Sequence, residues 1–410
     1  MKVLLVNKYL YPRAGDAIST ITTGELLLSK GHDVIFWGME HPLNPHYKYE
    51  GYFVKNIDYN SKLSILQKIK AAGRILYSFE AKKKIGMLID KEKPDIAHLN
   101  NFAHQISPSI LDALKKRGIP AIMTIRDFKL VCPRYDMSLH DSPCEKCKDG
   151  RYYNCVVNKC LKGSLSKSIL SACEMYLHHG ILHIYDSIRC FVATTGFTRS
   201  KMTEMGFRGD LEVLNNFIDV SKYEPRYDWE DKTIVYFGRI ARTKGLVTLL
   251  DAVKEIKGVT LKLIGDGPLK DELAEKIKKE NINNVQLLSH RNGEELWREI
   301  RNCMFCVIPS EWYELFGRTI MEAAALGKPT IGSRIGGIPE LIKHNETGLL
   351  FEPHNAVDLR SKIEYLLNDP EKIKEMGRNA RIFAQEELGA EKHYRKLMDI
   401  YEMALKGKKG

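Results

Sequence analysis

Short runs of consecutive apolar residues recur along the chain, separated by loops and by segments with helical spacing. In the first half these runs cover 2–7, 33–37, 96–99, 121–125 and 189–194. In the second half they cover 211–214, 233–237, 260–264, 285–288, 305–308 and 329–332. Strands without alternating polar residues are buried on both faces, as in a parallel sheet covered by helices. The pattern therefore predicts an α/β protein with two such sheets.

The length of the chain agrees with two separate cores. It has 410 residues, of which 44% are hydrophobic, and a single core of that size would be unusual. We expect a first domain at 1–207, a second at 208–385, and a terminal helical segment at 386–410. Ligands of parallel α/β sheets bind outside the carboxyl ends of the strands, so a cleft between the domains is the expected site.

The net charge of the chain indicates what kind of partner it could bind. The length of its apolar runs indicates whether it could span a membrane. The formal net charge is +11, which favours nucleic acid, an anionic lipid surface or a phosphorylated substrate. No uncharged apolar run approaches the roughly 18 residues that a spanning helix needs, and the first residues lack the pattern of a signal peptide. We expect a cytoplasmic protein.

The stretch EWYELFGRTIMEAAALGKP (311–329) carries two acids, Glu314 and Glu322, around a predicted helix start at Phe316 and Gly317. Backbone N–H groups at such a start can bind a phosphate. If the segment were helical throughout, the two acids would lie roughly 12 Å apart along the axis. They therefore suit the two ends of an elongated ligand that has a sugar at each end and phosphates between.

A second loop adds positive charge on the same side of the predicted sheet. Arg239 and Lys244 follow the strand 233–237 directly, next to Gly238. An arginine fork and a lysine can clamp a diphosphate and neutralise a leaving group. Gly265 begins a third loop at the end of the next strand.

These segments resemble, in order, the second half of the retaining glycosyltransferases of family 4, which have two Rossmann-like domains facing across a cleft (the GT-B type). The matching segments are Gly238-Arg239 with Lys244-Gly245, Gly265-Asp266-Gly267-Pro268, Pro309-Ser310 with Glu314-Leu315-Phe316-Gly317 and Glu322-Ala323, Gly327-Lys328-Pro329, Gly336-Gly337-Ile338-Pro339-Glu340, and Gly348-Leu349-Leu350. A weaker similarity extends over the first half.

The resemblance implies a nucleotide-diphosphate sugar as the donor. It implies that Arg239 and Lys244 hold the diphosphate. Glu314 would contact hydroxyls of the donor sugar, and Glu322 would contact the ribose. The acceptor would be a hydroxyl of a sugar or of a lipid-linked glycan, and the anomeric configuration would be retained. No metal or other cofactor is then required for catalysis, and the last helix would cross back onto the first domain.

The donor-binding residues expected from the loops and the resemblance together include the glycines and the phenylalanine at the loop ends. They are Gly15, Gly238, Gly265, Phe316 and Gly317.

The first half departs from the family at two positions. Where relatives carry two glycines followed by a glutamate, this chain reads Pro12-Arg13-Ala14-Gly15-Asp16-Ala17, so one glycine remains. Where many relatives have a histidine, this chain has Arg126. His98, His104 and Arg126 are the candidates for the acceptor side.

Four cysteines form a cluster within an insertion near 132–161: Cys144, Cys147, Cys155 and Cys160. In a cytosolic chain this clustering predicts a structural zinc site, with free or redox-active thiols as the alternative.

Between Lys62 and Ile89, apolar and basic residues are interleaved as in a basic amphipathic helix. Such a helix can lie on an anionic membrane, which predicts a peripheral membrane contact; a helix packed on the sheet with a solvated basic face is the alternative.

The sequence thus predicts a glycosyltransferase in glycan, polysaccharide or glycolipid biosynthesis. A nucleotide-sugar epimerase of the same architecture is one alternative. A non-catalytic nucleic-acid-binding protein is the other, but no nucleic-acid motif is recognisable and the basic residues form no single stripe, so nucleic acid is not an expected partner.

Overall fold

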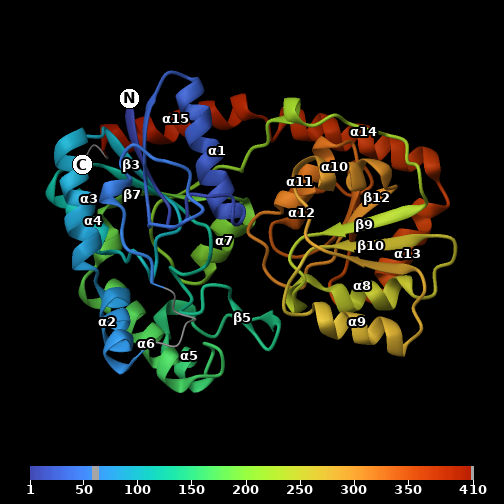
Figure 1. Cartoon of the computed structure of the whole chain (residues 1–410), viewed down its shortest axis with the longest axis horizontal. Helices are drawn as coiled ribbons and strands as arrows, with labels where there is room; N and C mark the ends of the chain where they lie inside the picture. The colour runs from blue at the N-terminus through green and yellow to red at the C-terminus, as the bar shows by residue number, and fades with distance from the viewer. Residues whose placement is uncertain (58–63, 408–410) are drawn as a thin grey trace. The chain divides into compact units, whose positions relative to one another are not determined.

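The computed structural model describes residues 1–57 and 64–407, and the chain divides into two compact units (Figure 1). Unit 1 consists of Met1–Met137, Glu145–Leu214 and Tyr394–Gly410, and unit 2 of Ser138–Cys144 and Asn215–His393. Each unit contains its own six-stranded sheet. The predicted α/β class with two parallel-sheet, Rossmann-like domains is confirmed.

The sheet of unit 1 has the strand order β2-β1-β3-β4-β7-β8, and all its neighbours pair in parallel. Its strands are β1 (Lys2–Val6), β2 (Asp33–Trp37), β3 (Ile96–Leu99), β4 (Ala121–Thr124), β7 (Ile188–Ala193) and β8 (Leu211–Val213). The helices are α1 (Gly15–Ser29), α2 (Ile65–Leu76), α3 (Phe79–Glu92), α4 (Ser109–Lys116), α5 (Tyr153–Val157), α6 (Leu165–Met175), the π-helix η3 (Tyr176–Ile181), α7 (Gly196–Glu204) and most of α15 (Ala390–Lys406).

The sheet of unit 2 has the order β11-β10-β9-β12-β13-β14 and is also parallel throughout. Its strands are β9 (Thr233–Phe237), β10 (Thr260–Ile264), β11 (Val285–Leu288), β12 (Phe305–Ile308), β13 (Thr330–Ser333) and β14 (Gly348–Phe351). The helices are α8 (Leu246–Val253), α9 (Lys270–Lys279), α10 (Gly293–Asn302), α11 (Arg318–Ala325), α12 (Ile338–Leu341), α13 (Ala356–Leu367) and α14 (Pro370–Glu386). A short antiparallel hairpin, β5 (Ser138–Leu139) with β6 (Ser142–Pro143), also belongs to this unit.

The units divide later in the sequence than the predicted boundary at 207/208. Strand β8 was expected to open the second sheet, but it pairs in parallel with β7, with Phe191 beside Leu211. The first sheet therefore extends by one strand, and unit 2 takes up the chain again at Asn215. An apolar run of three or four residues carries no information about which sheet it joins, because the pairing partner decides it.

The predicted basic helix between Lys62 and Ile89 is two helices, α2 and α3. The first ends at Leu76, with Tyr77 as its C-cap, and Ser78 caps the second, since its side chain accepts a hydrogen bond from the Ala81 N–H at 3.1 Å. Residues 62 and 63 lie outside the described residues. A serine cap satisfies one of the free N–H groups at a helix start.

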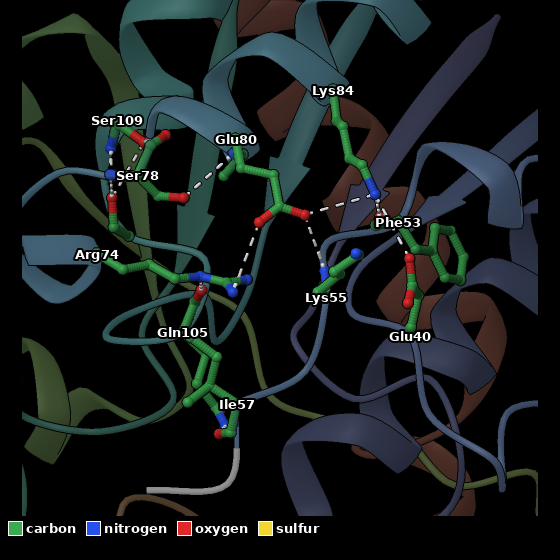
Figure 2. Close-up of polar contacts among 12 residues, drawn as sticks. Glu40, Phe53, Lys55, Ile57, Arg74, Ser78, Glu80, Lys84, Gln105 and Ser109 are labelled. Atoms are coloured by element: carbon green, nitrogen blue, oxygen red, sulfur yellow. Dashed lines mark hydrogen bonds and ion pairs between the residues drawn. The ribbon is translucent and has the colours of Figure 1, made fainter. Parts of the chain in front are cut away.

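Several cations of this segment pair inside unit 1 (Figure 2). Arg74 donates to the Gln105 carbonyl oxygen at 2.8 Å and lies 3.6 Å from Glu80. Lys84 lies 3.5 Å from Glu80 as well. Glu80 also accepts the Lys55 N–H at 3.1 Å. These cations hold α2 and α3 against the neighbouring loops and are not free for an external partner.

Helix α15 returns the chain to unit 1 and packs on its sheet. Leu397, Ile400, Tyr401 and Ala404 are buried in one cluster with apolar residues of β1, β3 and β4. Tyr401 also hydrogen-bonds to His98 of β3, at 2.8 Å. The apolar face of this helix therefore completes the core on one side of the sheet.

We expect Leu397→Ala to lower the free energy of unfolding of unit 1 by about 2–5 kcal/mol, because the side chain is 0% exposed and its removal leaves a cavity. The matched control is Leu405→Ala on the same helix, where the side chain is 42% exposed and the change should be within about 0.5 kcal/mol. Urea unfolding followed by circular dichroism measures both. Equal effects of the two substitutions would contradict this packing of α15.

Candidate functional site

The predicted donor-site residues of unit 2 lie on loops at the carboxyl ends of its strands. In this sheet β9 is flanked by β10 on one side and by β12 on the other, so the strand order reverses between β9 and β12. Such a switch point is where open parallel sheets bind ligands. The loop 238–245 follows β9, and the loop 309–317 follows β12.

Gly245 brings these two loops into contact. Its φ is +67°, and a Cβ built on it would lie 1.8 Å from the Pro309 carbonyl oxygen. The neighbouring backbone closes the contact, because the Glu311 N–H donates to the Thr243 carbonyl oxygen at 2.9 Å. Only glycine fits a positive φ with backbone this close.

A buried ion pair spans the two loops. Lys244 donates to Glu314 in a short contact, and the two side chains are 21% and 12% exposed. The same carboxylate accepts the Ser310 hydroxyl at 3.0 Å. The Lys244 ammonium also lies 4.9 Å from the centre of the Trp312 ring, a favourable cation–π distance.

The surroundings of Glu314 keep it ionised. Burial raises the pKa of this carboxyl, but the charge of Lys244 and the hydrogen bonds from Lys244 and Ser310 bring the pKa below its usual value. A charged, oriented carboxylate accepts hydrogen bonds and does not donate them. It suits contact with hydroxyl groups.

The backbone of Glu314 is fixed as well. The Gly337 N–H donates to its carbonyl oxygen at 2.7 Å. A Cβ on Gly336, whose φ is +62°, would lie 2.5 Å from the Glu314 nitrogen. The loop after β13 therefore packs directly on Glu314, which explains the glycine at position 336.

Helix α11 begins at Arg318, two residues later than predicted, with Gly317 as its N-cap. The N-cap has no side chain to bond the first N–H groups, and Phe316 packs against the core of unit 2. A helix start without a capping side chain leaves backbone donors for an anion.

Glu322 lies on the second turn of α11. It accepts a hydrogen bond from the Arg318 side chain at 3.0 Å. Burial raises the pKa of Glu322, and the charge of Arg318 opposes that rise. The structure thus pairs the two predicted acids with different cations, Glu314 with Lys244 and Glu322 with Arg318.

Arg239 differs from these paired groups. Its side chain is exposed, and within 1–57 and 64–407 it makes no hydrogen bond or ion pair. Its backbone is held, because the buried Tyr236 hydroxyl donates to the Arg239 carbonyl oxygen at 2.7 Å. The loop after β10 supports it, since a Cβ on Gly265 would lie 1.9 Å from the Gly238 oxygen. The guanidinium of Arg239, at the edge of the sheet, is therefore available to bind a ligand.

Sequence reasoning missed the polar groups that hold the loop 309–317. Ser310 and Trp312 both contact the Lys244–Glu314 pair. Glu311 accepts from Thr248 of α8 at 2.5 Å and lies 3.3 Å from His354. The position of Ser310, directly after a buried strand, was the one available signal.

Unit 1 gathers a second polar group at the carboxyl ends of its own strands. Asn101, after β3, donates to Asp16 of α1 at 3.1 Å. Arg126, after β4, donates to Asn100 at 3.0 Å, and burial lowers its pKa to about 10. Gly15 is the first residue of α1, with open space where a Cβ would lie. The order β2-β1-β3 makes this the switch point of the first sheet.

The two candidate histidines have different positions. His98 is 3% exposed, and its ring nitrogens bond Tyr401 at 2.8 Å and Thr124 at 2.7 Å. It is a core residue, so the structure corrects its assignment to the acceptor side. His104 is partly exposed beside the buried Glu174, at 3.5 Å, and burial lowers its pKa.

The clustered cysteines do not fit a zinc ion in this arrangement. Cys147 and Cys155 are buried in an apolar cluster with Tyr152, and Cys160 packs on it. Cys155 hydrogen-bonds to Cys160, which raises the pKa of Cys155 and lowers that of Cys160 to about 7. In the described part of the chain, no three His, Cys, Asp or Glu side chains converge to hold a metal.

Part of unit 2 is similar to a known group of proteins. Residues 220–383 match the family model described as glycosyl transferases group 1. The uncharacterized glycosyltransferase MJ1178 of Methanocaldococcus jannaschii is 34% identical over 171 residues, 40% of this chain and 48% of that protein. The match thus spans about half the length of that relative. An uncharacterized 42.6 kDa protein in the cps region of Klebsiella pneumoniae is 26% identical over 354 residues, 83% of this chain and 87% of that protein.

Solved structures extend the likeness to both units. A glycosyltransferase from Rickettsia africae, 20% identical, has a TM-score of 0.69 over 100% of this chain and 99% of its own. The Anabaena protein Alr3699/HepE in complex with UDP-glucose, 16% identical, has a TM-score of 0.66 over 98% of this chain and 99% of its own. The chain has the GT-B fold, and the family model supports a glycosyltransferase.

We expect protein purified without added metal to contain well below one zinc per chain, because three of the four cysteines are committed to an apolar cluster. Elemental analysis measures this content. About one zinc per chain, lost in a Cys144→Ser/Cys147→Ser variant, would show instead that the loop gathers its thiolates around the metal.

Proposed function

We propose that this protein is a retaining glycosyltransferase of family 4, which moves a sugar from a nucleotide-diphosphate sugar to a hydroxyl acceptor. The observation that carries the proposal is the Lys244–Glu314 pair at the switch point of unit 2. A carboxylate for sugar hydroxyls and a cation for phosphate lie side by side there. The match of residues 220–383 to the group 1 family supports it.

The cations would act on the leaving group. As the bond between the anomeric carbon and the phosphate oxygen breaks, negative charge grows on the diphosphate. Arg239, which has no partner within 1–57 and 64–407, and Lys244, which has one, would neutralise that charge. The start of α11 adds partial positive charge in the same way, through the dipole of the helix.

The acceptor oxygen would attack the anomeric carbon from the face that the diphosphate leaves. The acceptor's proton then passes to the departing phosphate oxygen, so that the protein need not supply a base. Glu314, held ionised by Lys244 and Ser310, would bind the donor sugar and favour the positive charge that builds on its ring.

Glu322 and its partner would hold the other end of the donor. Arg318 fixes the direction of this carboxylate, which can accept the ribose hydroxyls. The Anabaena neighbour was solved with UDP-glucose, so uridine-diphosphate hexoses are the first donors to test. For the acceptor, we propose a growing polysaccharide or glycolipid, since one relative lies in a cps region.

An epimerase of nucleotide sugars is the second candidate, because it would use the same donor contacts. The two activities separate in one assay. An epimerase converts the donor sugar with no acceptor present, whereas a transferase needs the acceptor hydroxyl for turnover beyond slow hydrolysis.

We expect Arg239→Ala to lower kcat by roughly 10²–10³, the loss typical of one contact made in the transition state, with an unchanged Tm because the side chain is exposed. The donor is the nucleotide sugar whose diphosphate raises the Tm most in a thermal-shift screen, and the assay follows release of that diphosphate.

The matched control is Arg242→Ala in the same loop. Arg242 is also exposed, but it already pairs with Glu272 and Asp141, so its loss should leave kcat near the wild-type value. Wild-type turnover in Arg239→Ala would remove this residue from the mechanism.

We expect Glu322→Ala to raise the donor KM by roughly 10- to 100-fold with a smaller effect on kcat, because hydrogen bonds to a charged group are lost in the ground and transition states alike. Glu275→Ala on α9, an exposed glutamate of the same unit, is the control and should keep the wild-type KM. Steady-state kinetics over a range of donor concentrations measures the KM of both variants. An unchanged KM in Glu322→Ala argues against the ribose contact.

A further inference from the structure

Helix α6 has its polar and apolar faces reversed. The side chains that point into unit 1 and are buried include two serines and a glutamate: Ser168, Ser171, Ala172, Glu174 and Met175. The exposed residues of α6 are Leu165, Ser166, Lys167, Ile169 and Cys173. The apolar ones among them repeat at helical spacing, and Tyr176 at the start of η3 continues the row. A surface helix of a globular protein normally shows the opposite arrangement.

A buried polar network fixes the inward face. The Lys129 ammonium donates to Glu174 at 2.7 Å and to Ser171 at 3.2 Å, and the Ser171 hydroxyl donates to the Pro133 carbonyl oxygen at 2.8 Å. Breaking a buried charge pair is costly, so this network sets the rotation of α6. The network explains why the serines point inward. It does not require the outward side chains to be apolar, and the outward face of a surface helix is normally polar.

The outward apolar residues continue onto neighbouring elements. Tyr153 and Val157 of α5 are 54% and 73% exposed, and Ile181 at the end of η3 is 71% exposed. Hydrogen bonds join these elements: the Tyr153 N–H donates to the Tyr176 hydroxyl at 3.2 Å. Figure 1 shows α5 and α6 next to each other in unit 1, with α2 close by. We call the outward side of α5, α6 and η3 the α5–α6 surface.

The charges on this surface have one sign. Residues 151–182 contain four cations, Arg151, Lys159, Lys162 and Lys167, all exposed. Their one acid, Glu174, is buried against Lys129. Within residues 151–182, the exposed apolar side chains are therefore accompanied by exposed cations and by no exposed acid.

We propose that the α5–α6 surface docks on an anionic lipid bilayer. The apolar side chains would enter the boundary between headgroups and acyl chains, and the lysines would meet lipid phosphates. A second copy of this chain would place lysine against lysine, so self-association through this surface is disfavoured. Within 1–57 and 64–407 no helix has the length and apolar character to cross a bilayer, which makes this a surface contact.

This inference corrects the sequence-based choice of membrane element. The basic helix predicted between Lys62 and Ile89 contains three cations that form internal ion pairs, Arg74, Lys82 and Lys84. Helix α2 contributes at its edge only, through exposed Lys68, Ile69 and Lys70. The docking does not depend on the transfer activity, because it uses none of the residues at the donor site.

Flotation with lipid vesicles tests the proposal. Full-length protein, without donor or acceptor, is mixed with vesicles of phosphatidylcholine alone or of phosphatidylcholine with phosphatidylglycerol. We expect binding to the anionic vesicles that weakens as salt is added, and little binding to the neutral ones.

Matched double variants locate the contact. Val157→Asp/Ile169→Asp should weaken binding to the anionic vesicles about tenfold or more, because two inserted apolar groups become acids. The control, Val357→Asp/Ile382→Asp, makes the same changes at side chains of similar exposure on α13 and α14 of unit 2, 76% and 48% against 73% and 43%. It should bind like the wild type.

A charge pair completes the test. Lys159→Glu/Lys167→Glu should weaken binding about tenfold or more, whereas Lys257→Glu/Lys279→Glu, the same charge change on exposed lysines of unit 2, should have a much smaller effect. The proposal is overturned if the wild type ignores anionic vesicles, if each variant matches its control, or if the wild type is a dimer that Val157→Asp/Ile169→Asp dissociates. Donor binding is measured separately in every variant, so loss of one property does not mimic loss of the other.

Discussion

Burial of the parallel strands on both faces is the constraint on which the rest of the structure depends. Strands such as β1, β9 and β12 are almost free of solvent contact, so helices must cover each face, and every connection between strands crosses over in the same sense. All loops that follow strands then meet at one edge of each sheet. Two polar groups described above, one around Lys244 and one around Asn101, lie at such an edge, beside the strand where the order reverses.

In unit 2, close backbone contacts hold the loops at that edge in one arrangement. Gly245 and Gly336 let neighbouring loops approach to distances that a Cβ would forbid, and the Lys244–Glu314 pair forms within the resulting wall. A buried pair gives little net stability, since desolvation opposes the Coulomb attraction. Its value here is orientation, because the pair fixes the direction of the Glu314 carboxylate and of the Lys244 ammonium, which in the proposed function face a sugar and a phosphate.

Unit 1 also contains a buried ion pair, and there the pair determines which face of a helix is exposed. Lys129 and Glu174 are both nearly inaccessible and form an ion pair, and Lys129 also donates to Ser171. This network turns the polar residues of α6 inward and leaves Leu165 and Ile169 in solvent. The inverted helix thus arises from one buried ion pair, and its apolar outer face, ringed by lysines, is the feature that folding does not explain.

Much of this protein follows from its sequence alone, because the signals are local. Apolar runs mark the buried strands, and glycines mark the tight loops after them. The spacing of Glu314 and Glu322 predicts the two ends of a binding site. Other features needed the tertiary structure, because they depend on partners distant in sequence. Pairing with β7 assigned β8 to the first sheet, Tyr401 made His98 a core residue, and Cys147 and Cys155 pack in an apolar cluster. Lys129, forty-five residues before Glu174, decided which face of α6 meets the solvent, and no local pattern encodes a contact over that separation.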